Sequence, residues 1–586
     1  MDGWTGRILR IDLSTKTTEE LRLPLEVYAR NLGGKGLCGE LLFEHFCQPW
    51  DAPQMPLVFM TGPLNNTSSP TSGRMTVMSR SPLTGAIADA SVGGKLGTML
   101  KRAGYDGLVV TGQSATWCGL NIDENGVRFS AAGHLAGLNI SAIYAKLKNT
   151  STRADAAYAM IGPAAEAGVR YAAIVFDGHY LAGRGGLGLS MAAKKLKFIA
   201  VSGQQKTAVS DPAELQLARE DIYRLVAASP VLTGELGIGN YGTGALYDLM
   251  RSRRMMPTNN FRQTWFAPGA QMNAHAYKEI YHPKKFGCAG CHIQCKKIGA
   301  GGEIMPEFET MSHFSALLGN QDLGAVVEAN RLCNEAGMDT ISAGVTLATY
   351  AELQDQPLSA VKFLALLEDI AAGRGEGAAL GQGALALATA ADTPELAMVT
   401  KGLEFPAYDP RGAYGMALAY ATSTRGGCHL RAYPISHEIL RKPVATERFS
   451  FSGKARIIKI SEDLNAVVDS LTACKFLFFA ASLEEYARAL QAVTGLQTSA
   501  QQLLKLGERI YFRERLMNAR NGFDAKDDDI PPRFFNEAGT GTEVLRVKPL
   551  DRGEFLAERA AYYRIRGLDD QGRPRAQKCA ELELPC

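Results

Sequence analysis

Three cysteines lie close together in the run GCAGCHIQC, and their spacing suits metal binding. These are Cys288, Cys291 and Cys295, and a fourth candidate, Cys474, stands far along the chain in DSLTACKF. On a helix, this spacing would place the three clustered sulfurs on roughly one face. Four cysteine thiolates are the usual ligands of a [4Fe–4S] cluster. The pattern therefore predicts an electron-transfer centre.

Two other interpretations use the same residues. A structural zinc site also takes four cysteines, but it usually shows two paired CxxC units. Here the fourth candidate, Cys474, stands alone in an apolar stretch. A free cysteine can also pack as a small hydrophobic residue with no ligand role. Spacing alone leaves the iron–sulfur, zinc and metal-free interpretations open.

The composition is that of a globular protein. The 586 residues are 46% hydrophobic and 21% charged, which predicts several domains with sizeable cores. A net charge of +3 gives no electrostatic case for nucleic-acid binding. Eleven cysteines in this length are too few for a disulfide framework, so their clustering indicates metal in a reducing compartment. With neither a secretory signal pattern nor a membrane span, we expect a cytoplasmic protein.

The chain divides by periodicity. Short apolar runs separated by turn residues predict a β-rich N-terminal part, with a hairpin at Asn125-Gly126. Ser210-Asp211-Pro212 predicts a helix start, and helical periodicity dominates from there on. The charged, proline-containing end of the chain predicts a surface tail. The predicted domains are 1–208 (β-rich base), 209–415 (helical, with three cluster cysteines) and 416–586 (helical, with the fourth cysteine and the charged tail).

From residue 3 to about residue 520, the chain resembles the tungsten-dependent aldehyde:ferredoxin oxidoreductase family. Many separate motifs occur in the family's order: GWTGRILRIDL, GGKGL, SGRMTVMSRSPLTG, GGKLG, GRGGLG, GCAGCHIQC, PEFET, GMDTISAG, RGGCHLRAY and DSLTACKF. The resemblance implies an α+β fold. In that fold an N-terminal β-rich base domain is followed by two mainly α-helical domains, which enclose a buried cofactor.

The same resemblance implies the cofactors. They are a tungsten bis-pterin with no direct protein ligand to the metal, and a [4Fe–4S] cluster bound by Cys288, Cys291, Cys295 and Cys474. Molybdenum is the alternative metal, since neither metal would touch the protein. The pterin phosphates of the family share a Mg²⁺ ion, whose ligands resemble Ser91 and a backbone carbonyl near Ala182. Magnesium prefers oxygen ligands and keeps several waters.

Two six-residue segments resemble the family's pterin-binding motif, Asp-x-x-Gly-Leu-Asp/Cys. They are 334–339 and 469–474. A buried carboxylate can accept hydrogen bonds from pterin N–H groups, so Asp339 and Asp469 are the expected ligands, with Ala473 beside the second pterin. Alone, such an aspartate would be interpreted as a cap or turn residue. The chain departs from the motif at Asn334, where Asp is usual, and at Thr472 and Ala473, where Gly-Leu is usual. A threonine there restricts the backbone.

The β-rich part is expected to supply the rest of the cradle. Arg74 in SGRMTV matches an arginine that lies between cluster and pterin in the family, and a guanidinium can bridge two acceptors at once. Glycines in two turns would let backbone N–H groups approach the phosphates. The alternative is that they are only turn glycines: Gly93, Gly94, Gly185 and Gly186.

Two side chains match the family's catalytic positions. They are Glu309 in PEFET, with Glu307 as the fallback, and His429 in RGGCHLRAY, with His437 as the rival. A carboxylate in a dry site can have a raised pKa and act as an acid or base, and histidine titrates near neutrality. Without the resemblance, a surface glutamate and a core or capping histidine would be the expected roles.

The implied reaction is the oxidation of an aldehyde to a carboxylic acid. The protein would orient the substrate and move protons, while the cofactor carries the electron chemistry. Electrons would leave through the cluster to ferredoxin or a small iron–sulfur subunit. The alternatives are a reductase on the same scaffold, acting like class II benzoyl-CoA reductase or on carboxylic acids, and a non-catalytic iron–sulfur scaffold. The resemblance leaves open whether the chain forms a homo-oligomer.

Overall fold

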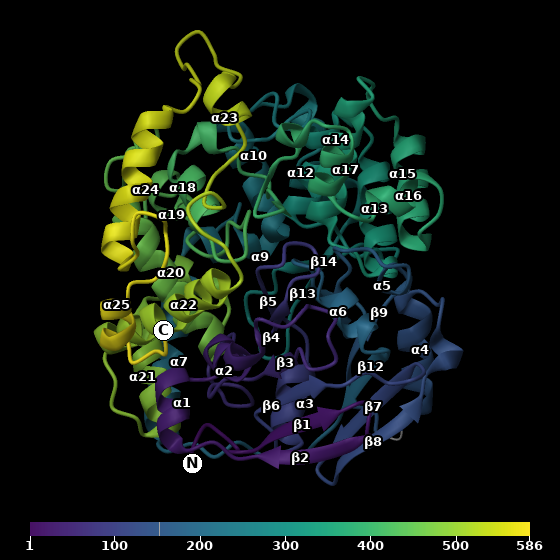
Figure 1. The fold of residues 1–586 in the computed structure, drawn as a ribbon, viewed down its shortest axis with the longest axis vertical. Coiled ribbons are helices and arrows are strands. Elements are labelled where there is room, and N and C mark those ends of the chain that lie inside the picture. The colour runs from purple at the N-terminus through teal and green to yellow at the C-terminus, as the bar shows by residue number, and fades with distance from the viewer. Residues whose placement is uncertain (152) are drawn as a thin grey trace.

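A computed structural model describes residues 1–151 and 153–586. The N-terminal part forms a base of β-sheets, and most of the helices lie above it (Figure 1). The first sheet has the strand order β2-β1-β6-β3-β4-β5. Its strands are β1 (Ile8–Asp12), β2 (Thr17–Leu21), β3 (Leu57–Met60), β4 (Met75–Arg80), β5 (Ile87–Val92) and β6 (Gly107–Thr111).

The strand sequences explain their places in this sheet. β3 reads LVFM and is buried throughout, as expected for a central strand. β2 reads TTEEL, is almost wholly exposed and forms an edge, where charged side chains discourage pairing with other chains.

The second sheet has the order β11-β10-β9-β12-β7-β8. The hairpin predicted at Asn125-Gly126 is confirmed, because β7 and β8 pair antiparallel with Asp123 opposite Gly126. The strands are β7 (Cys118–Asp123), β8 (Gly126–Ala131), β9 (Ala157–Ile161), β10 (Ile174–Phe176), β11 (Tyr180–Ala182) and β12 (Leu196–Val201).

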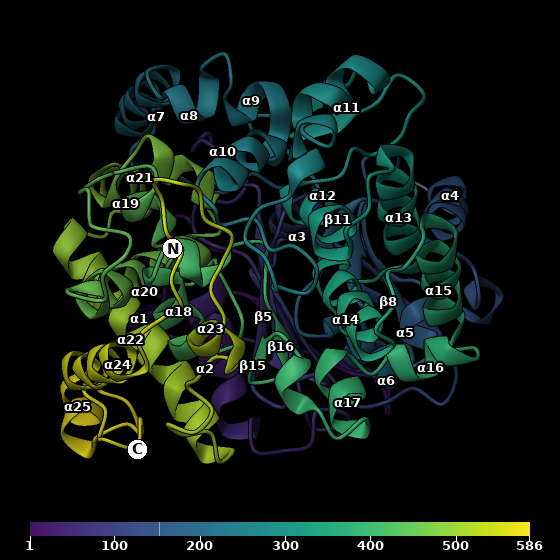
Figure 2. The same cartoon turned by 90° about the horizontal axis from the view of Figure 1, so that it is seen from above.

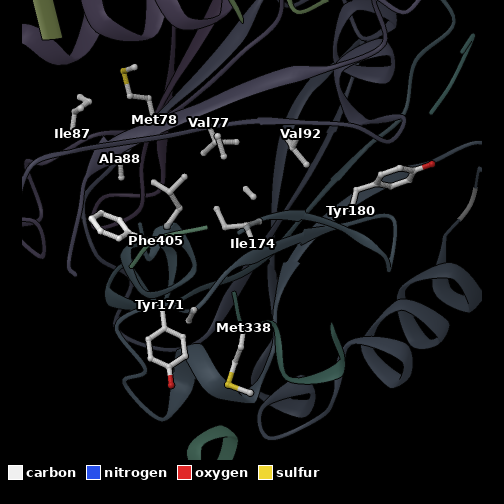
Figure 3. Close-up of a cluster of buried hydrophobic side chains, with 14 of the residues drawn as sticks. Val77, Met78, Ile87, Ala88, Val92, Tyr171, Ile174, Tyr180, Met338 and Phe405 are labelled. Carbon is white, nitrogen blue, oxygen red and sulfur yellow. The ribbon is translucent and has the colours of Figure 1, made fainter. Parts of the chain in front are cut away.

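An apolar core joins the two sheets to the helices above. Val77 of β4 and Ile174 of β10 point into it, together with Met338 and Phe405 from the helical part (Figure 3). All four side chains are fully buried. The base also carries short helices: α1 (Leu25–Asn31), α2 (Gly34–Leu42), α3 (Leu96–Arg102), α4 (Ile140–Thr150), α5 (Pro163–Glu166) and α6 (Leu187–Ala193).

Along the chain the remaining helices form two groups. Seen from above, the green-yellow and yellow helices lie on one side and most of the teal helices on the other (Figure 2). The first group follows the base directly and includes two short hairpins: α7 (Pro212–Ala227), α8 (Pro230–Thr233), α9 (Ile238–Tyr241), α10 (Leu246–Ser252), α11 (Ala274–Tyr281), β13 (Lys284–Phe286), β14 (Lys296–Ile298), α12 (Phe308–Phe314), α13 (Leu323–Ala336), α14 (Thr340–Leu353), α15 (Ala360–Ala372), α16 (Glu376–Leu380), α17 (Ala384–Ala390), β15 (Val399–Thr400) and β16 (Leu403–Glu404). The second group is α18 (Gly415–Thr422), α19 (Ile435–Glu438), α20 (Lys454–Leu471), α21 (Leu483–Thr494), α22 (Ala500–Arg520), α23 (Arg533–Asn536), α24 (Arg552–Arg566) and α25 (Ala576–Glu581). The α+β prediction is confirmed.

The predicted start of the helical part is also confirmed. Asp211 is the N-cap of α7, its carboxylate accepts the N–H of Glu214 at 2.9 Å, and Pro212 opens the helix. Among the residues that the structure describes, no helix is long and apolar enough to cross a membrane.

The prediction of a surface tail at the end of the chain is wrong. Helices α24 and α25 pack onto the second helical group, and Cys579 forms a disulfide with Cys586. Arg566 is fully buried, where it forms ion pairs with Glu462 and Asp463. The charged sequence of this segment suggested that it is exposed to solvent. Its ionic partners lie on α20, far away along the chain, so the segment's own sequence did not reveal them.

Candidate active site

Cys288, Cys291 and Cys295 lie in the loop of the β13–β14 hairpin, so the helical arrangement considered for them is wrong. The loop turns back on itself, and the N–H of Cys291 donates to the carbonyl of Cys288 at 3.1 Å. Gly93 in the base lies against this loop. A Cβ at Gly93 would overlap the sulfur of Cys288, which explains the glycine by close approach of the two segments.

Cys474 joins the three loop cysteines from the other helical group. It follows the end of α20, and its N–H donates to the carbonyl of Thr71 in the base at 3.1 Å. Burial raises the pKa of Cys474 to about 11, and the negative charges of Cys291 and Cys288 add to that rise. Burial also raises the pKa of Cys295, to which Glu307, Cys474 and Cys288 contribute. The four thiols therefore share one site.

The four thiols do not form a mononuclear metal site. Within residues 1–151 and 153–586, no group of three or more His, Cys, Asp or Glu side chains could hold a single metal ion. A tetrahedral zinc site draws four sulfurs onto one ion at about 2.3 Å each. The iron–sulfur cluster at these four cysteines stays a prediction.

Arg74 connects the cysteine site to the base. Its Nε donates to the hydroxyl of Ser91 at 2.9 Å, and its Nη2 donates to the carbonyl of Ser91 at 2.6 Å. Burial lowers the pKa of Arg74, but the thiols Cys474, Cys288 and Cys295 outweigh burial and raise it overall. The guanidinium is therefore a fixed positive charge beside the thiols.

These contacts argue against Ser91 as a magnesium ligand. Both Ser91 oxygens accept from the Arg74 guanidinium, whose positive charge would oppose a cation at the same place. Ala182, the other predicted contributor, ends strand β11, which packs against the strand that carries Ser91.

The first pterin-motif candidate is the junction of α13 and α14. Gly337 ends α13 in the left-handed conformation, at φ 72°, and Asp339 caps α14 by accepting the N–H groups of Ile341 and Ser342. The junction is fastened to the base, because Asp339 N–H donates to the carbonyl of Tyr171 at 3.1 Å. The cap role weighed for Asp339 is thus real, and the carboxylate also lies 3.3 Å from Nε of Arg184.

The second candidate has the same helix-ending geometry. Thr472 ends α20 in the left-handed conformation, at φ 54°, at the position that corresponds to Gly337. Asp469 stands in the last turn of α20, where Lys475 lies 2.8 Å from its Oδ2. Burial would raise the pKa of Asp469, but Lys475, Lys35 and nearby arginine lower it overall. Ala473 is fully buried directly behind this turn.

A hydrogen bond from the Thr472 side chain offsets the strain of its left-handed backbone. A β-branched residue is strained at positive φ, where glycine is not. The Thr472 hydroxyl donates to Oδ1 of Asn65 at 2.6 Å. Asn65 in turn donates to the carbonyls of Ser72, at 2.7 Å, and Arg74, at 2.9 Å. The replacement of glycine by threonine therefore ties α20 to the segment that carries Arg74.

Glu309 and His429 face one another across the two helical groups. Oε2 of Glu309 accepts the N–H of Ala407 at 2.7 Å, and Oε1 lies 3.5 Å from Nε2 of His429. Burial raises the pKa of Glu309 to about 8 and lowers that of His429 well below its ordinary value, with Arg184 adding to the second shift. Near neutral pH the pair is a protonated acid beside a neutral imidazole.

The rival residues take other roles. Glu307 forms an ion pair with Lys296 at 2.5 Å, and this pairing lowers the pKa of Glu307. Nδ1 of His437 lies 3.0 Å from the carbonyl of Val444. The geometry favours Glu309 and His429.

Two family models match the chain. One, described as the N-terminal domain of aldehyde ferredoxin oxidoreductase, matches residues 8–203, and the other, domains 2 and 3 of that enzyme, matches residues 217–584. The tungsten-containing aldehyde ferredoxin oxidoreductases of Pyrococcus furiosus and Thermococcus kodakarensis are 35% and 36% identical to it, over 100% of this chain and 99% of each relative. The chain belongs to the aldehyde ferredoxin oxidoreductase family. It is an oxidoreductase.

More distant proteins share the architecture. A WOR-like subunit of an aliphatic sulfonate oxidoreductase from Pyrococcus furiosus is 25% identical over 100% of this chain and 97% of that protein. The active site complex BamBC of benzoyl coenzyme A reductase, in complex with 1,5-dienoyl-CoA, contains a chain that superposes with a TM-score of 0.85 at 20% identity. The match covers 100% of this chain and 97% of the other. At that identity the likeness shows the fold alone.

Close packing accounts for three of the glycines that were predicted to approach the phosphates. Gly94 has φ 105°, and a Cβ there would come within 2.7 Å of Oδ2 of Asp177, which also accepts the N–H of Lys95. A Cβ at Gly186 would overlap the carbonyl of Arg170. Gly185 has φ 82°, and its Cβ would lie 3.0 Å from that of Ala88. Each has a packing reason, so none needs a phosphate to explain it.

Three charged residues of this site were not predicted from the sequence. Arg184 lies inside the glycine run GRGGLG, and Lys475 directly follows a cluster cysteine, so adjacency to motifs could have identified both. Nζ of Lys475 donates to the carbonyl of Leu430 at 2.8 Å while it pairs with Asp469. Arg431 forms an ion pair with Asp89 in the base, and it lies in the motif RGGCHLRAY two residues after His429, so the motif could have identified it too.

Four buried polar atoms at this site form no hydrogen bond among the described residues, although the first two have a charged or titratable group nearby: Nε of Arg184, Oε1 of Glu309, Oδ1 of Asp469 and Nε of Arg431. Unpaired buried polar atoms are costly, so a native protein keeps them for a purpose. The side chains of Arg184, Glu309 and the neighbouring His429 are not fully covered, since they keep 11%, 17% and 13% of their surface. These donors and acceptors fit a large polar group between the base and the helices.

Proposed function

We propose that this protein oxidises aldehydes to carboxylic acids at a tungsten bis-pterin and passes the electrons through a [4Fe–4S] cluster. The supporting observation is one arrangement. A Glu309–His429 pair with an unpartnered carboxyl oxygen occurs in the same fold as four converging cysteines, in a chain similar over its whole length to tungsten-containing aldehyde ferredoxin oxidoreductases.

The cluster would be held by Cys288, Cys291, Cys295 and Cys474. A hairpin loop and a helix end bring these sulfurs together from two helical groups. Arg74 would compensate the negative charge of the cluster and donate toward the pterin, because one guanidinium can serve two acceptors.

The pterins would be held at the two helix ends. Asp469 has an ionised carboxylate with one oxygen, Oδ1, free to accept from pterin N–H groups. Nε of Arg184, 3.3 Å from the Asp339 carboxylate, donates no hydrogen bond and could also serve a pterin. Asp339 already accepts from the start of α14, but a carboxylate has lone pairs for further donors. The metal, tungsten or the alternative molybdenum, would be bound by the pterins.

The protein's own part in the reaction is proton transfer. When bound, the cofactors supply the two-electron acceptor and its one-electron relay. Aldehyde and water yield the carboxylic acid, two electrons and two protons. Glu309, once ionised, can take a proton at Oε1, and His429 can donate a hydrogen bond to the substrate oxygen. The low-dielectric surroundings of both groups strengthen these contacts.

The test is metal analysis and turnover of protein purified without oxygen. We expect about one tungsten and about four irons per chain, and reduction of a viologen dye that depends on an aldehyde. Cys474→Ser should lose most of the iron. Iron without tungsten or molybdenum, together with no aldehyde oxidation, would refute the proposal in favour of a non-catalytic scaffold. Dye-dependent reduction of an acyl thioester or a carboxylic acid, without aldehyde oxidation, would support the reductive alternatives.

The remaining parts of the proposal concern context. Ferredoxin or a small iron–sulfur subunit would take the electrons, a small aldehyde would be the substrate, and the enzyme would act in the cytoplasm. A Mg²⁺ ion between the pterin phosphates would need ligands other than Ser91, with the carbonyl near Ala182 as the remaining predicted contributor.

A further inference from the structure

The segment that carries the cysteine loop is strongly basic. Residues 274–298 contain five lysines and one glutamate, while the whole 586-residue chain carries a net charge of only +3. Three of the nine histidines also fall in this segment. The positive charge is therefore concentrated around the cysteines rather than spread over the molecule.

These lysines divide into inward and outward groups. Lys296 pairs with Glu307, and Nζ of Lys297 donates to the backbone carbonyl of Gln294 at 2.8 Å. Both ammonium groups therefore already have partners within the protein. The outward group is exposed, and within the described residues none of its members forms an ion pair: Lys278, Lys284 and Lys285. Nζ of Lys278 lies 4.7 Å from the centroid of the Tyr241 ring, so among the described residues Lys284 and Lys285 are the members with neither an ion-pair nor a cation–π partner.

Lys284 and Lys285 lie on β13, shortly before the cysteine loop, and this loop reaches the surface. Gly290 and His292, close to Cys291 on either side, are both exposed. The ring of His292 meets the ring of Tyr223 on α7 edge to face, with centroids 4.5 Å apart. The guanidinium of Arg219 lies 5.1 Å from the centroid of the same tyrosine. Helix α7 thus adds another basic group beside the loop.

We propose that Lys278, Lys284, Lys285 and Arg219 form a docking surface, the basic collar, for a small protein electron carrier with an acidic surface. The proposal rests on the proposed function, which requires electrons to leave through the cluster. Opposite charges steer a carrier to the right place and raise its association rate. The exposed loop at Cys291 then lies under the docked carrier.

The electron balance defines the carrier. Each aldehyde oxidised releases two electrons, so two one-electron carriers are each reduced once, and the protons go to solvent. An acidic iron–sulfur protein such as a ferredoxin meets both requirements, since it accepts one electron at a time and carries negative charge.

The experiment reverses charge at the collar and at a distant matched site. The variant is Lys284→Glu/Lys285→Glu on β13. The control is Lys146→Glu/Lys148→Glu on α4, where both lysines are also exposed. Each variant is assayed with the same aldehyde, using an acidic ferredoxin or a small viologen dye as acceptor. Binding of oxidised ferredoxin is measured separately by calorimetry at low and high salt.

We expect the collar variant to lose about tenfold in kcat/KM for ferredoxin and about tenfold in affinity, with a weaker salt dependence. The control should match wild type in both, and all three proteins should reduce the dye equally. Equal ferredoxin kinetics and binding in the collar and control variants would overturn the docking proposal. A collar variant that loses dye activity in parallel would overturn it too, since the defect would then lie inside the protein. If wild type reduces no dye, the proposed function fails instead.

Discussion

The raised pKa of Glu309 makes the pH dependence of turnover the most direct test of the site. A carboxyl acts as a base only when ionised, and burial raises the pKa of Glu309 to about 8. Its ionised fraction then increases from about one tenth at pH 7 to about nine tenths at pH 9. We therefore expect kcat/KM for an aldehyde to rise roughly tenfold over that range and to level off above it.

Glu309→Gln should remove this dependence. It keeps an acceptor for the Ala407 N–H but cannot take a proton, so we expect a flat profile and a loss of about 10²–10⁴ in kcat/KM. The same change should stabilise the cofactor-free protein. A carboxyl with a raised pKa does not lower the free energy of unfolding below pH 4.5. It lowers that free energy increasingly as the pH rises to about 8, and by a constant amount above that. At pH 7.5 the cost is about 4 kcal/mol at most, and glutamine does not incur it.

The assay is dye reduction from pH 6 to pH 10, with thermal unfolding of the cofactor-free protein alongside. Glu438→Gln is the control. Burial also raises the pKa of Glu438, to about 7, but Glu438 accepts from Gly415 and pairs with Lys454, away from His429. The control should keep the wild-type pH profile of activity. A flat wild-type profile, or wild-type turnover in Glu309→Gln with full cofactor content, would refute the reasoning.

Three further predictions test other parts of the structure. His429→Asn should reduce kcat by about 10²-fold or more, while His437→Asn should leave dye turnover unchanged, and equal effects would contradict the assignment. Thr472→Val should destabilise the protein by about 1–2 kcal/mol in denaturant unfolding because it keeps the strain and loses the hydroxyl. Thr472→Gly should change stability by less than about 1 kcal/mol, and the reverse order would remove the strain argument. Arg566→Ala should cost about 3–5 kcal/mol, because buried Glu462 loses its ion-pair partner and Asp463 keeps only Lys459, and exposed Arg564→Ala should cost almost nothing. A similar cost for both would mean that the C-terminal helices do not pack as described.

Local features of the fold could be predicted from the sequence because neighbouring residues decide them. Asn125-Gly126 favours a tight turn whatever surrounds it, and Asp211 can cap a helix using only the next few N–H groups. The two six-residue motifs also end helices alike, with Gly337 and Thr472 both left-handed. Such features need no knowledge of the rest of the chain.

The loop cysteines show where local reasoning stops. Their spacing fits one face of a helix, yet the segment is a hairpin loop held between β13 and β14 and packed against Gly93. A helical pattern of three residues does not outweigh two flanking strands that pair with each other. Spacing alone also could not choose between zinc and a cluster, because that depends on how far apart the sulfurs stand.

The sequence by itself determined the class of the protein: its family motifs, its α+β order and the residue types available for chemistry. Only the tertiary structure decided which of them meet. Glu309 faces His429, Asp469 pairs with Lys475 while one of its oxygens stays free, and Arg566 is buried against α20. The physical reason is that burial and pairing of charges depend on residues distant in sequence. A raised pKa, an unpartnered oxygen or a buried arginine therefore has no local signature.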